Sequence, residues 1–316
     1  MARKDTAYLS KKPKNVFDRI KTIQLFVLAL PAILNIFIFS YIPMAGIIIA
    51  FKKIDFSLGI FRSQWAGLNN FKFFFTSSDA WLVIRNTLGY NIANIFVGTA
   101  ISVIFAIFLF EVTSRKTTKF YQTVFFFPYF FSWVIVSYMS IAFLGGKPMG
   151  ILVSVLNSIG INATRFYLTP FLWPPYLVFL SIWKGLGYTS VVFYAAILGL
   201  PSDCFEAAKI DGATRLQIIR YITLPLIVPV ISIMTLLAVG KIFYSDFGLY
   251  YFIPNQIAAL IPITQTIDTY VYRALTQTSN ISMAAASGFF QSVFGFIVVL
   301  MCNLIVRKIN PENSIF

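Results

Sequence analysis

Hydrophobic and polar positions along this chain are grouped in long blocks, and the apolar blocks are long enough to cross a bilayer as helices, which takes about 20 residues. Each block also carries a few polar side chains, as is typical of a packed bundle around a pathway rather than of isolated anchors. The pattern therefore predicts an all-α, polytopic membrane protein with six transmembrane helices. The predicted blocks are residues 23–50, 87–110, 121–144, 176–199, 226–245 and 286–306.

Composition supports a membrane protein and makes a nucleic-acid partner unexpected. Of the 316 residues, 58% are hydrophobic and only 11% are charged, against about 25% charged residues in an ordinary soluble domain. The net charge of +14 is high enough to suit nucleic-acid binding, but the cations lie mainly between the apolar blocks rather than in one basic domain. Membrane topology explains these cations better.

The loop cations predict the orientation of the chain, because cytosolic loops of membrane proteins are enriched in Lys and Arg. The strongest cluster lies in residues 1–22, which are expected to form a basic cytosolic segment. Residues 23–306 are expected to form a single transmembrane domain with a cytosolic loop at 201–225, and residues 307–316 a cytosolic tail. Both termini are then in the cytosol. The further cytosolic cations are Arg115, Lys116, Lys119, Lys209, Arg215, Arg220, Arg307 and Lys308.

The first apolar block resembles a secretory signal because it follows a basic segment. It is too long for the apolar part of a signal peptide, and no cleavage site of small residues ends it. We therefore expect a retained first helix.

Several classes of chemistry are excluded by the residues that the chain lacks. There is no histidine, and the cysteines are Cys204 and Cys302, so a zinc site or a Ser-His-Asp or Cys-His centre cannot be assembled from this chain alone. The chain has no GxxxxGK[ST] phosphate-binding loop. It is expected to be no enzyme, to hold no metal and to bind no cofactor itself.

The two long loops on the other side of the membrane differ in composition. Residues 52–86 are rich in aromatic side chains, which favours short helices lying in the membrane interface. Residues 145–175 are rich in glycine and proline, which indicates an irregular loop.

The cytosolic loop contains the charged stretch EAAKIDGATRLQIIRYITLP, residues 206–225. Gly212 divides it into two short helices at an angle, and the second carries Leu216, Ile219 and Ile222 at helical spacing, together with Ile218. Pro225 marks the entry to the fifth apolar block. We call residues 201–225 the elbow. Amphipathicity alone also fits a loop that rests on lipid headgroups.

The elbow resembles a motif of ABC importer permeases. Glu206-Ala207-Ala208, Gly212 and Ile222-Thr223-Leu224-Pro225 match the EAA-x3-G-x9-I-x-LP loop of that family at every specified position. Residues 41–75, 183–203 and 267–275 are similar to the carbohydrate permeases of the maltose-type superfamily. Within it they most resemble the branch that imports oligosaccharides released from polysaccharides such as alginate or rhamnogalacturonan.

This resemblance implies a type I ABC importer permease fold in the cell membrane of a bacterium. It also implies an assembly of this chain with a second, homologous permease, as a heterodimer, and with two copies of a cytosolic ATPase that hold ATP and Mg²⁺. An extracytoplasmic binding protein would deliver the oligosaccharide.

In that family the EAA loop docks into the ATPase. Glu206 would then contact a cation of the ATPase, although it could also serve only to stabilise its own helix N-terminus. Asp211 and Arg215 lie four residues apart and are expected to form a local ion pair. The residues assigned to ATPase coupling are Glu206, Ala207, Ala208, Asp211, Gly212, Leu224 and Pro225.

A sugar pathway needs aromatic faces and polar groups, and two segments flanking the elbow offer both. In the fourth block these are Lys184, Gly185 and Tyr188, and in maltose-type permeases the position matching Tyr188 contacts sugar. At the end of the fifth block they are Lys241, Tyr244, Ser245 and Asp246.

Two interpretations of the lysines remain open. Lys184 and Lys241 attract an anionic oligosaccharide, or Lys241 pairs with Asp246 while Lys184 reaches toward the outer interface. Weaker candidates are expected to bond between helices or to lie at the interface. They are Asn91, Asn94, Trp133, Tyr138 and Gln291.

Other functions remain open from the sequence. A permease for a solute other than a sugar fits the elbow equally well. A secondary transporter would need a coupling-ion site, and the blocks offer few carboxylates beyond Glu111 and Asp246. A membrane-embedded glycan transferase would need a catalytic domain, for which no cytosolic loop is large enough.

Overall fold

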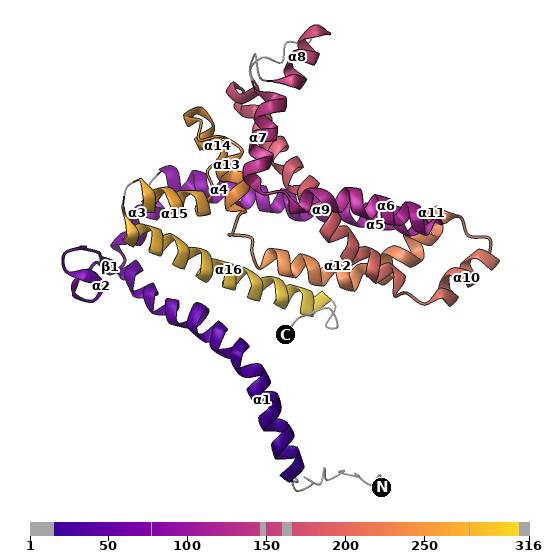
Figure 1. Ribbon diagram of the computed structural model, residues 1–316, viewed down its shortest axis with the longest axis horizontal. Helices are drawn as coiled ribbons and strands as arrows, with labels where there is room; N and C mark the ends of the chain where they lie inside the picture. Colours follow the sequence, from indigo (N-terminus) through magenta and orange to yellow (C-terminus); the bar gives the residue numbers. More distant parts are fainter. Residues whose placement is uncertain (1–15, 77, 146–149, 160–165, 278, 310–316) are drawn as a thin grey trace. The chain divides into compact units, whose positions relative to one another are not determined.

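The computed structural model describes residues 16–76, 78–145, 150–159, 166–277 and 279–309 (Figure 1). The outermost parts of the two predicted cytosolic terminal segments, residues 1–15 and 310–316, lie outside the described residues. By its internal contacts the chain divides into two units, Met1–Ile48 and Ile49–Phe316.

The first unit is a continuous apolar helical run. It consists of α1 (Val16–Ile36), a π turn η1 (Phe37–Tyr41) and the beginning of the 3-10 segment η2 (Ile42–Phe51). Residues Ile23–Phe51 are long and apolar enough to cross a membrane, which agrees with the first predicted block.

The second unit contains four further helical runs that meet the same test. They overlap the second, fourth, fifth and sixth predicted blocks and are Asp79–Glu111, Pro170–Leu198, Arg215–Val239 and Ile281–Lys308. Their elements are α4 (Ser78–Ala93), η3 (Asn94–Gly98) and α5 (Thr99–Glu111); η6 (Pro170–Leu172) and α9 (Trp173–Leu198); α11 (Arg215–Ile218), η7 (Ile219–Thr223) and α12 (Leu224–Val239); and α16 (Ile281–Ile309).

The third predicted block is bent rather than straight. It consists of α6 (Arg115–Phe126) with η4 (Phe127–Phe130), then α7 (Trp133–Leu144), and the two parts meet at an angle of 98°. The bend follows from the extended backbone at Phe131 and Ser132, where the Ser132 hydroxyl accepts a hydrogen bond from the Ile135 N–H and starts α7 as a new helix. The described part of the chain thus has five unbroken candidate spans, and a sixth if the bent pair is one span.

The predicted short helices in residues 52–86 are present as α2 (Gly59–Arg62) and α3 (Asn69–Thr76). A two-stranded hairpin that was not predicted encloses α2: β1 (Lys52–Lys53) pairs antiparallel with β2 (Gln64–Trp65). Strands of two residues are too short to leave an alternating pattern in a sequence.

The glycine- and proline-rich segment 145–175 is less irregular than predicted in its described part, because it contains α8 (Ile151–Ser158) and the 3-10 turn η5 (Phe166–Leu168). The connection between α12 and α16 is also helical. Its elements are α13 (Phe247–Phe252), η8 (Ala258–Leu260), α14 (Ile261–Thr264) and α15 (Ile267–Thr276).

Helix α9 is the central element of the second unit. It packs along α5, where the Ser102 and Thr189 hydroxyls lie 2.6 Å apart. On another side it approaches α6 so closely that a methyl group at Gly187 would overlap the backbone of Phe125 and Phe126. Glycine permits this approach, which fixes the helices around the site described next.

Candidate functional site

The elbow contains two helices joined at Gly212, as predicted. Helix α10 (Ser202–Ile210) ends in a turn in which Gly212 has φ +76°, a conformation that favours glycine. The second helix, α11, starts with a capping box in which Thr214 and Gln217 bond reciprocally between side chain and backbone. This local chemistry ends one helix and begins the other.

The second elbow helix is not separate from the fifth span, which corrects the sequence-based prediction. Helix α11 continues through the π turn η7 into α12, and Pro225 lies in the first turn of α12 rather than at the entry to the span. Proline lacks an N–H and crowds the carbonyl four residues earlier, and the wider π turn that precedes Pro225 relieves this conflict. The elbow is thus a direct extension of a spanning helix.

The residues assigned to ATPase coupling are mostly exposed. Glu206, Ala207, Asp211, Gly212 and Pro225 are exposed, and Leu224 is partly buried. The Ala208 side chain is buried within the chain, so of the two alanines it is Ala207 that is available to a partner.

Apolar side chains are also exposed on the elbow. Ile210 is 86% exposed and Leu216 74%, whereas Ile218 is buried, and Ile219 and Ile222 are partly buried. The predicted apolar face is therefore divided between the chain's own packing and solvent.

Two contacts connect the elbow to α5. The rings of Phe205 on α10 and Phe110 on α5 lie 5.6 Å apart, and Arg215 Nη1 lies 3.8 Å from Glu111 Oε2. This ion pair replaces the predicted one between Arg215 and Asp211. The spacing of four was misleading because the break at Gly212 takes Asp211 and Arg215 off a common helix.

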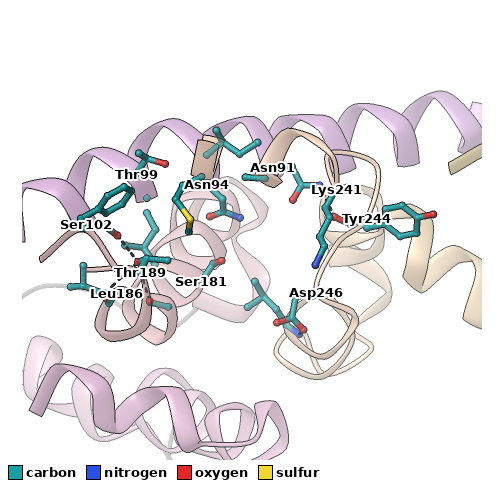
Figure 2. A pocket seen from close by; sticks show the side chains of 18 of the residues that line it. Asn91, Asn94, Thr99, Ser102, Ser181, Leu186, Thr189, Lys241, Tyr244 and Asp246 are labelled. Atoms are coloured by element: carbon teal, nitrogen blue, oxygen red, sulfur yellow. Dashed lines mark hydrogen bonds between the residues drawn. The ribbon is translucent and has the colours of Figure 1, made fainter. Parts of the chain in front are cut away.

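A cavity of about 360 Å³ lies further along the same helices (Figure 2). Its wall is made by the α4–η3–α5 run, by α9, by α12 with the turn that follows, and by α13. Figure 2 shows polar side chains of these segments around it. The polar lining residues are Asn91, Asn94, Thr99, Ser102, Ser181, Thr189, Lys241, Tyr244, Asp246 and Tyr250.

Much of this polar lining was missed as a site in the sequence, although a signal was present. Asn91, Asn94, Gly98 and Ser102 recur at intervals of three and four along the first wall. Ser181, Gly185 and Thr189 recur at intervals of four along α9. A stripe of small and polar residues at helical spacing inside an apolar block marks a helix face that lines a cavity or a helix contact.

Of the predicted substrate-path residues, Gly185, Lys241, Tyr244 and Asp246 line the cavity. Lys184, Tyr188 and Ser245 are absent from its lining. The Ser245 hydroxyl and N–H both donate to Asp268 Oδ2 at 2.7 Å, which anchors the turn after α12.

The placement of Lys241, Tyr244, Ser245 and Asp246 in the fifth span was wrong. Helix α12 ends at Val239, Gly240 is its C-cap, and these four residues lie in the connection to α13. Among the weaker candidates, Asn91 donates to the carbonyls of Ile242 and Tyr244. Gln291 donates to the Phe243 carbonyl. These two amides hold the connection against the neighbouring helices, rather than joining helix to helix as predicted.

Asp246 joins the cavity to the bend of the third block. Its Oδ1 accepts the N–H groups of Gly248 and Leu249 at the start of α13, and its Oδ2 accepts from Trp133 Nε1 at 2.6 Å. Lys184 Nζ lies 5.2 Å from the Trp133 ring and 5.3 Å from the Tyr129 ring, and donates to the Tyr129 carbonyl at 3.0 Å.

Within the described residues, Lys241 and Asp246 make no ion pair within 4.0 Å, and Arg215–Glu111 is the ion pair present. The Lys241 ammonium points into the cavity on the side of Asp246 (Figure 2). The same described part brings no three His, Cys, Asp or Glu side chains together in a group that could hold a metal.

Residues 98–311 match the family described as "Binding-protein-dependent transport system inner membrane component". The match covers more than half of the chain. The chain belongs to this family. It is therefore a multi-pass permease of the inner membrane, and the membership predicted from the elbow is confirmed.

Among curated proteins, the permease is similar to the polygalacturonan/rhamnogalacturonan transport system permease protein YteP of Bacillus subtilis. The two are 33% identical over 97% of this chain and 96% of the relative. A chain in the crystal structure of a bacterial ABC transporter involved in the import of the acidic polysaccharide alginate is 30% identical, with a TM-score of 0.84 over 94% of this chain and 100% of that one.

A second solved structure is that of a bacterial alginate ABC transporter in complex with an alginate pentasaccharide-bound periplasmic protein. It matches with a TM-score of 0.83 and 30% identity, over 94% of this chain and 98% of that chain. These likenesses confirm the predicted ABC importer permease fold.

Proposed function

We propose that this permease carries oligosaccharides, and specifically acidic ones, through the polar cavity between α4–α5, α9, α12 and α13. The observation that carries the proposal is the composition of the cavity: hydroxyl and amide groups and the Lys241 ammonium face one space. The similar proteins named above transport polygalacturonan, rhamnogalacturonan or alginate, of which polygalacturonan and alginate are polymers of uronic acids.

Each kind of group in the lining matches a part of such a substrate. Serine, threonine and asparagine side chains can exchange hydrogen bonds with sugar hydroxyls. Lys241 supplies the positive charge for a carboxylate. Asp246 makes no ion pair with Lys241 within 4.0 Å, and its oxygens accept from Trp133 and from two backbone N–H groups, so the ammonium remains available to a ligand.

The chain is proposed to work as one part of a larger importer. Its elbow docks on a separate ATPase that holds ATP and Mg²⁺, and two copies of this ATPase serve this chain and a second, homologous permease. An extracytoplasmic binding protein delivers the oligosaccharide. Both termini, residues 1–22 and 307–316, are proposed to lie in the cytosol with the elbow, at the two ends of one transmembrane domain.

The coupling route follows from the elbow's own contacts. Glu206, Ala207, Asp211 and Gly212 offer an exposed surface to the ATPase. Movement of that surface reaches α5 through Phe205–Phe110 and Arg215–Glu111. Because α5 also supplies Thr99 and Ser102 to the cavity wall, one rigid helix links ATPase contact and substrate space.

The test is uptake by cells in which this permease is the sole route for the substrate. We expect labelled trigalacturonate to be taken up, and a neutral trisaccharide to be taken up poorly. In Lys241→Gln, uptake of trigalacturonate below saturation should fall about tenfold, the equivalent of one charged contact. The exposed Lys72 of α3, which is absent from the cavity lining, provides the matched control Lys72→Gln.

Uptake of neutral but not acidic oligosaccharides would overturn the acidic substrate class. Co-purification of this chain without any ATPase subunit would overturn the proposed assembly.

A further inference from the structure

A second polar hollow, of about 570 Å³, lies at the end of the second unit opposite the elbow. It is formed where the hairpin β1–β2, the start of α3 and the start of α16 meet, while α10 and α11 lie at the other end (Figure 1). It shares no lining residue with the cavity. Its polar and aromatic lining includes Lys53, Gln64, Trp65, Asn69, Asn280 and Ser282.

Trp65 is held in place as a platform beside this hollow. Its side chain is 67% exposed, and it lies opposite Lys52 in the hairpin. Lys52 is 3% exposed, and its Nζ lies 5.3 Å from the indole centre while donating to the carbonyls of Ile60 and Phe61 at 3.0 and 2.7 Å. A buried ammonium that is bonded in this way fixes the indole through a cation–π contact. The exposed ring surface is therefore preorganised.

The rest of the hollow is equally well anchored. Asn70 Nδ2 donates to the carbonyls of Ala50 and Lys52, which holds α3 against the hairpin. The Ile54 N–H donates to Ser282 Oγ at 3.1 Å, which holds the hairpin against α16. The bond between Ile54 and Ser282 joins segments more than 200 residues apart in sequence, so the hollow is a built feature of the fold rather than a gap in a loop.

Three polar side chains in the lining are free within the described residues. Lys53, Gln64 and Asn69 make no side-chain hydrogen bond or ion pair there. Asn280 uses Oδ1 to accept the Met283 N–H and keeps its amide NH₂ group available. The lining holds no carboxylate; the Asp55 carboxylate lies outside it, and its Oδ1 accepts hydrogen bonds from the Ser57 hydroxyl and N–H.

We propose that this hollow is a binding site for an acidic oligosaccharide, outside the transport cavity. Trp65 stacks on a sugar ring, the amides of Gln64, Asn69 and Asn280 bond hydroxyls, and Lys53 binds a uronate carboxylate. The combination of a fixed aromatic face, free amides and one cation in a concave, carboxylate-free space is the chemistry that a uronate-containing saccharide requires. The choice of substrate class rests on the proposed function.

The experiment measures site occupancy directly, with the permease assembly in lipid nanodiscs and without the binding protein. In a Cys204→Ser, Cys302→Ser background, Gln64→Cys is modified by a maleimide in the presence and absence of tetragalacturonate. We expect the saccharide to slow modification several-fold, and a neutral tetrasaccharide to slow it less. Leu68→Cys is the matched control, because Leu68 is 64% exposed and lies outside the lining.

Variants then assign the recognition to residues. Trp65→Ala and Lys53→Gln, each combined with Gln64→Cys, should raise the tetragalacturonate concentration for half-maximal protection about tenfold, the effect of losing one stacking or charged contact. Trp81→Ala and Lys72→Gln should leave it unchanged, since both residues are exposed and outside the hollow.

Equal modification with and without saccharide would overturn the inference. Protection by tetragalacturonate that survives Trp65→Ala would also overturn it. In a separate measurement of association with the binding protein, a Trp65→Ala variant that loses only this association would overturn it too, because the hollow would then be a protein-docking surface. Uptake by the unmodified assembly is measured in parallel. If uptake fails, the proposed function is overturned. If uptake is normal but the saccharide gives no protection of Gln64→Cys, only the inference about this hollow is overturned.

Discussion

The elbow and the cavity are built in different ways. The elbow comes from one continuous stretch, 201–225, and its shape depends on bonds between residues close in sequence, such as the capping box of Thr214 and Gln217. The cavity is assembled from helices between residues 91 and 250. Its polar groups are positioned by bonds across the fold, such as that between Trp133 and Asp246. A local device can be recognised from sequence alone, whereas a site at a meeting of helices depends on packing.

The largest effect on stability is expected at Gly187 of α9, and Gly185 on the same helix is its matched control because its surroundings differ. Gly187→Ala forces a methyl group into the backbone of α6, whereas a methyl group at Gly185 meets open space. We expect Gly187→Ala to lower the free energy of unfolding by about 1–3 kcal/mol and to reduce the yield of folded permease. Gly185→Ala should fold normally and change uptake only. Thermal unfolding in detergent measures the difference, and equal melting temperatures would show that the α6–α9 approach does not hold the cavity.

The next effect tests the elbow at Gly212. Its φ of +76° costs alanine about 1–2 kcal/mol, although the space around it is open. Gly212→Ala should therefore still fold but reorient α10 against α11, so that ATP hydrolysis continues while uptake is lost.

Gly212→Asn is the matched variant, because asparagine tolerates this backbone conformation, and most uptake should remain. Hydrolysis and uptake measured on the same vesicles give the coupling ratio. Normal uptake by Gly212→Ala would refute a coupling role for the bend.

A smaller effect is expected at Asp246. Asp246→Ala removes both the cap of α13 and the acceptor of Trp133, at a cost of about 0.5–2 kcal/mol for the cap. Asp246→Asn keeps one acceptor oxygen, which can cap α13, but loses the acceptor of Trp133, so it should recover only the part of the stability that is due to the cap. Melting temperatures of both variants provide the measurement, and an alanine variant as stable as the asparagine variant would argue against positioning through these bonds.

The smallest effect is expected at the ion pair between elbow and α5. Arg215 is 83% exposed and its nitrogen lies 3.8 Å from Glu111, and exposed pairs of this kind contribute little. Arg215→Gln should leave stability and uptake within error. Phe205→Ala, which removes the ring contact with Phe110, should reduce uptake more. The reverse order would show that charge rather than packing connects the elbow to α5.

The sequence alone determined the features that depend on local spacing. The apolar blocks predicted five unbroken helical runs and the location of the bent one, because spanning a bilayer requires a long continuous run of apolar residues. The elbow was recognised at the correct residues, with its break at Gly212, since left-handed backbone and helix caps follow from neighbouring side chains.

The tertiary structure alone decided where the helices bend and which side chains meet. The end of α12 at Val239 places Lys241 and Asp246 outside the fifth span and in the wall of one cavity, and the turn at Phe131 and Ser132 starts α7 at Trp133, which donates to Asp246. The tertiary structure also pairs Arg215 with Glu111 rather than with Asp211, the partner predicted from the sequence. Hydrophobic burial in a bilayer specifies that a segment spans. It does not specify where the segment breaks or what its polar groups contact, because these depend on close packing and on hydrogen bonds between segments far apart in sequence.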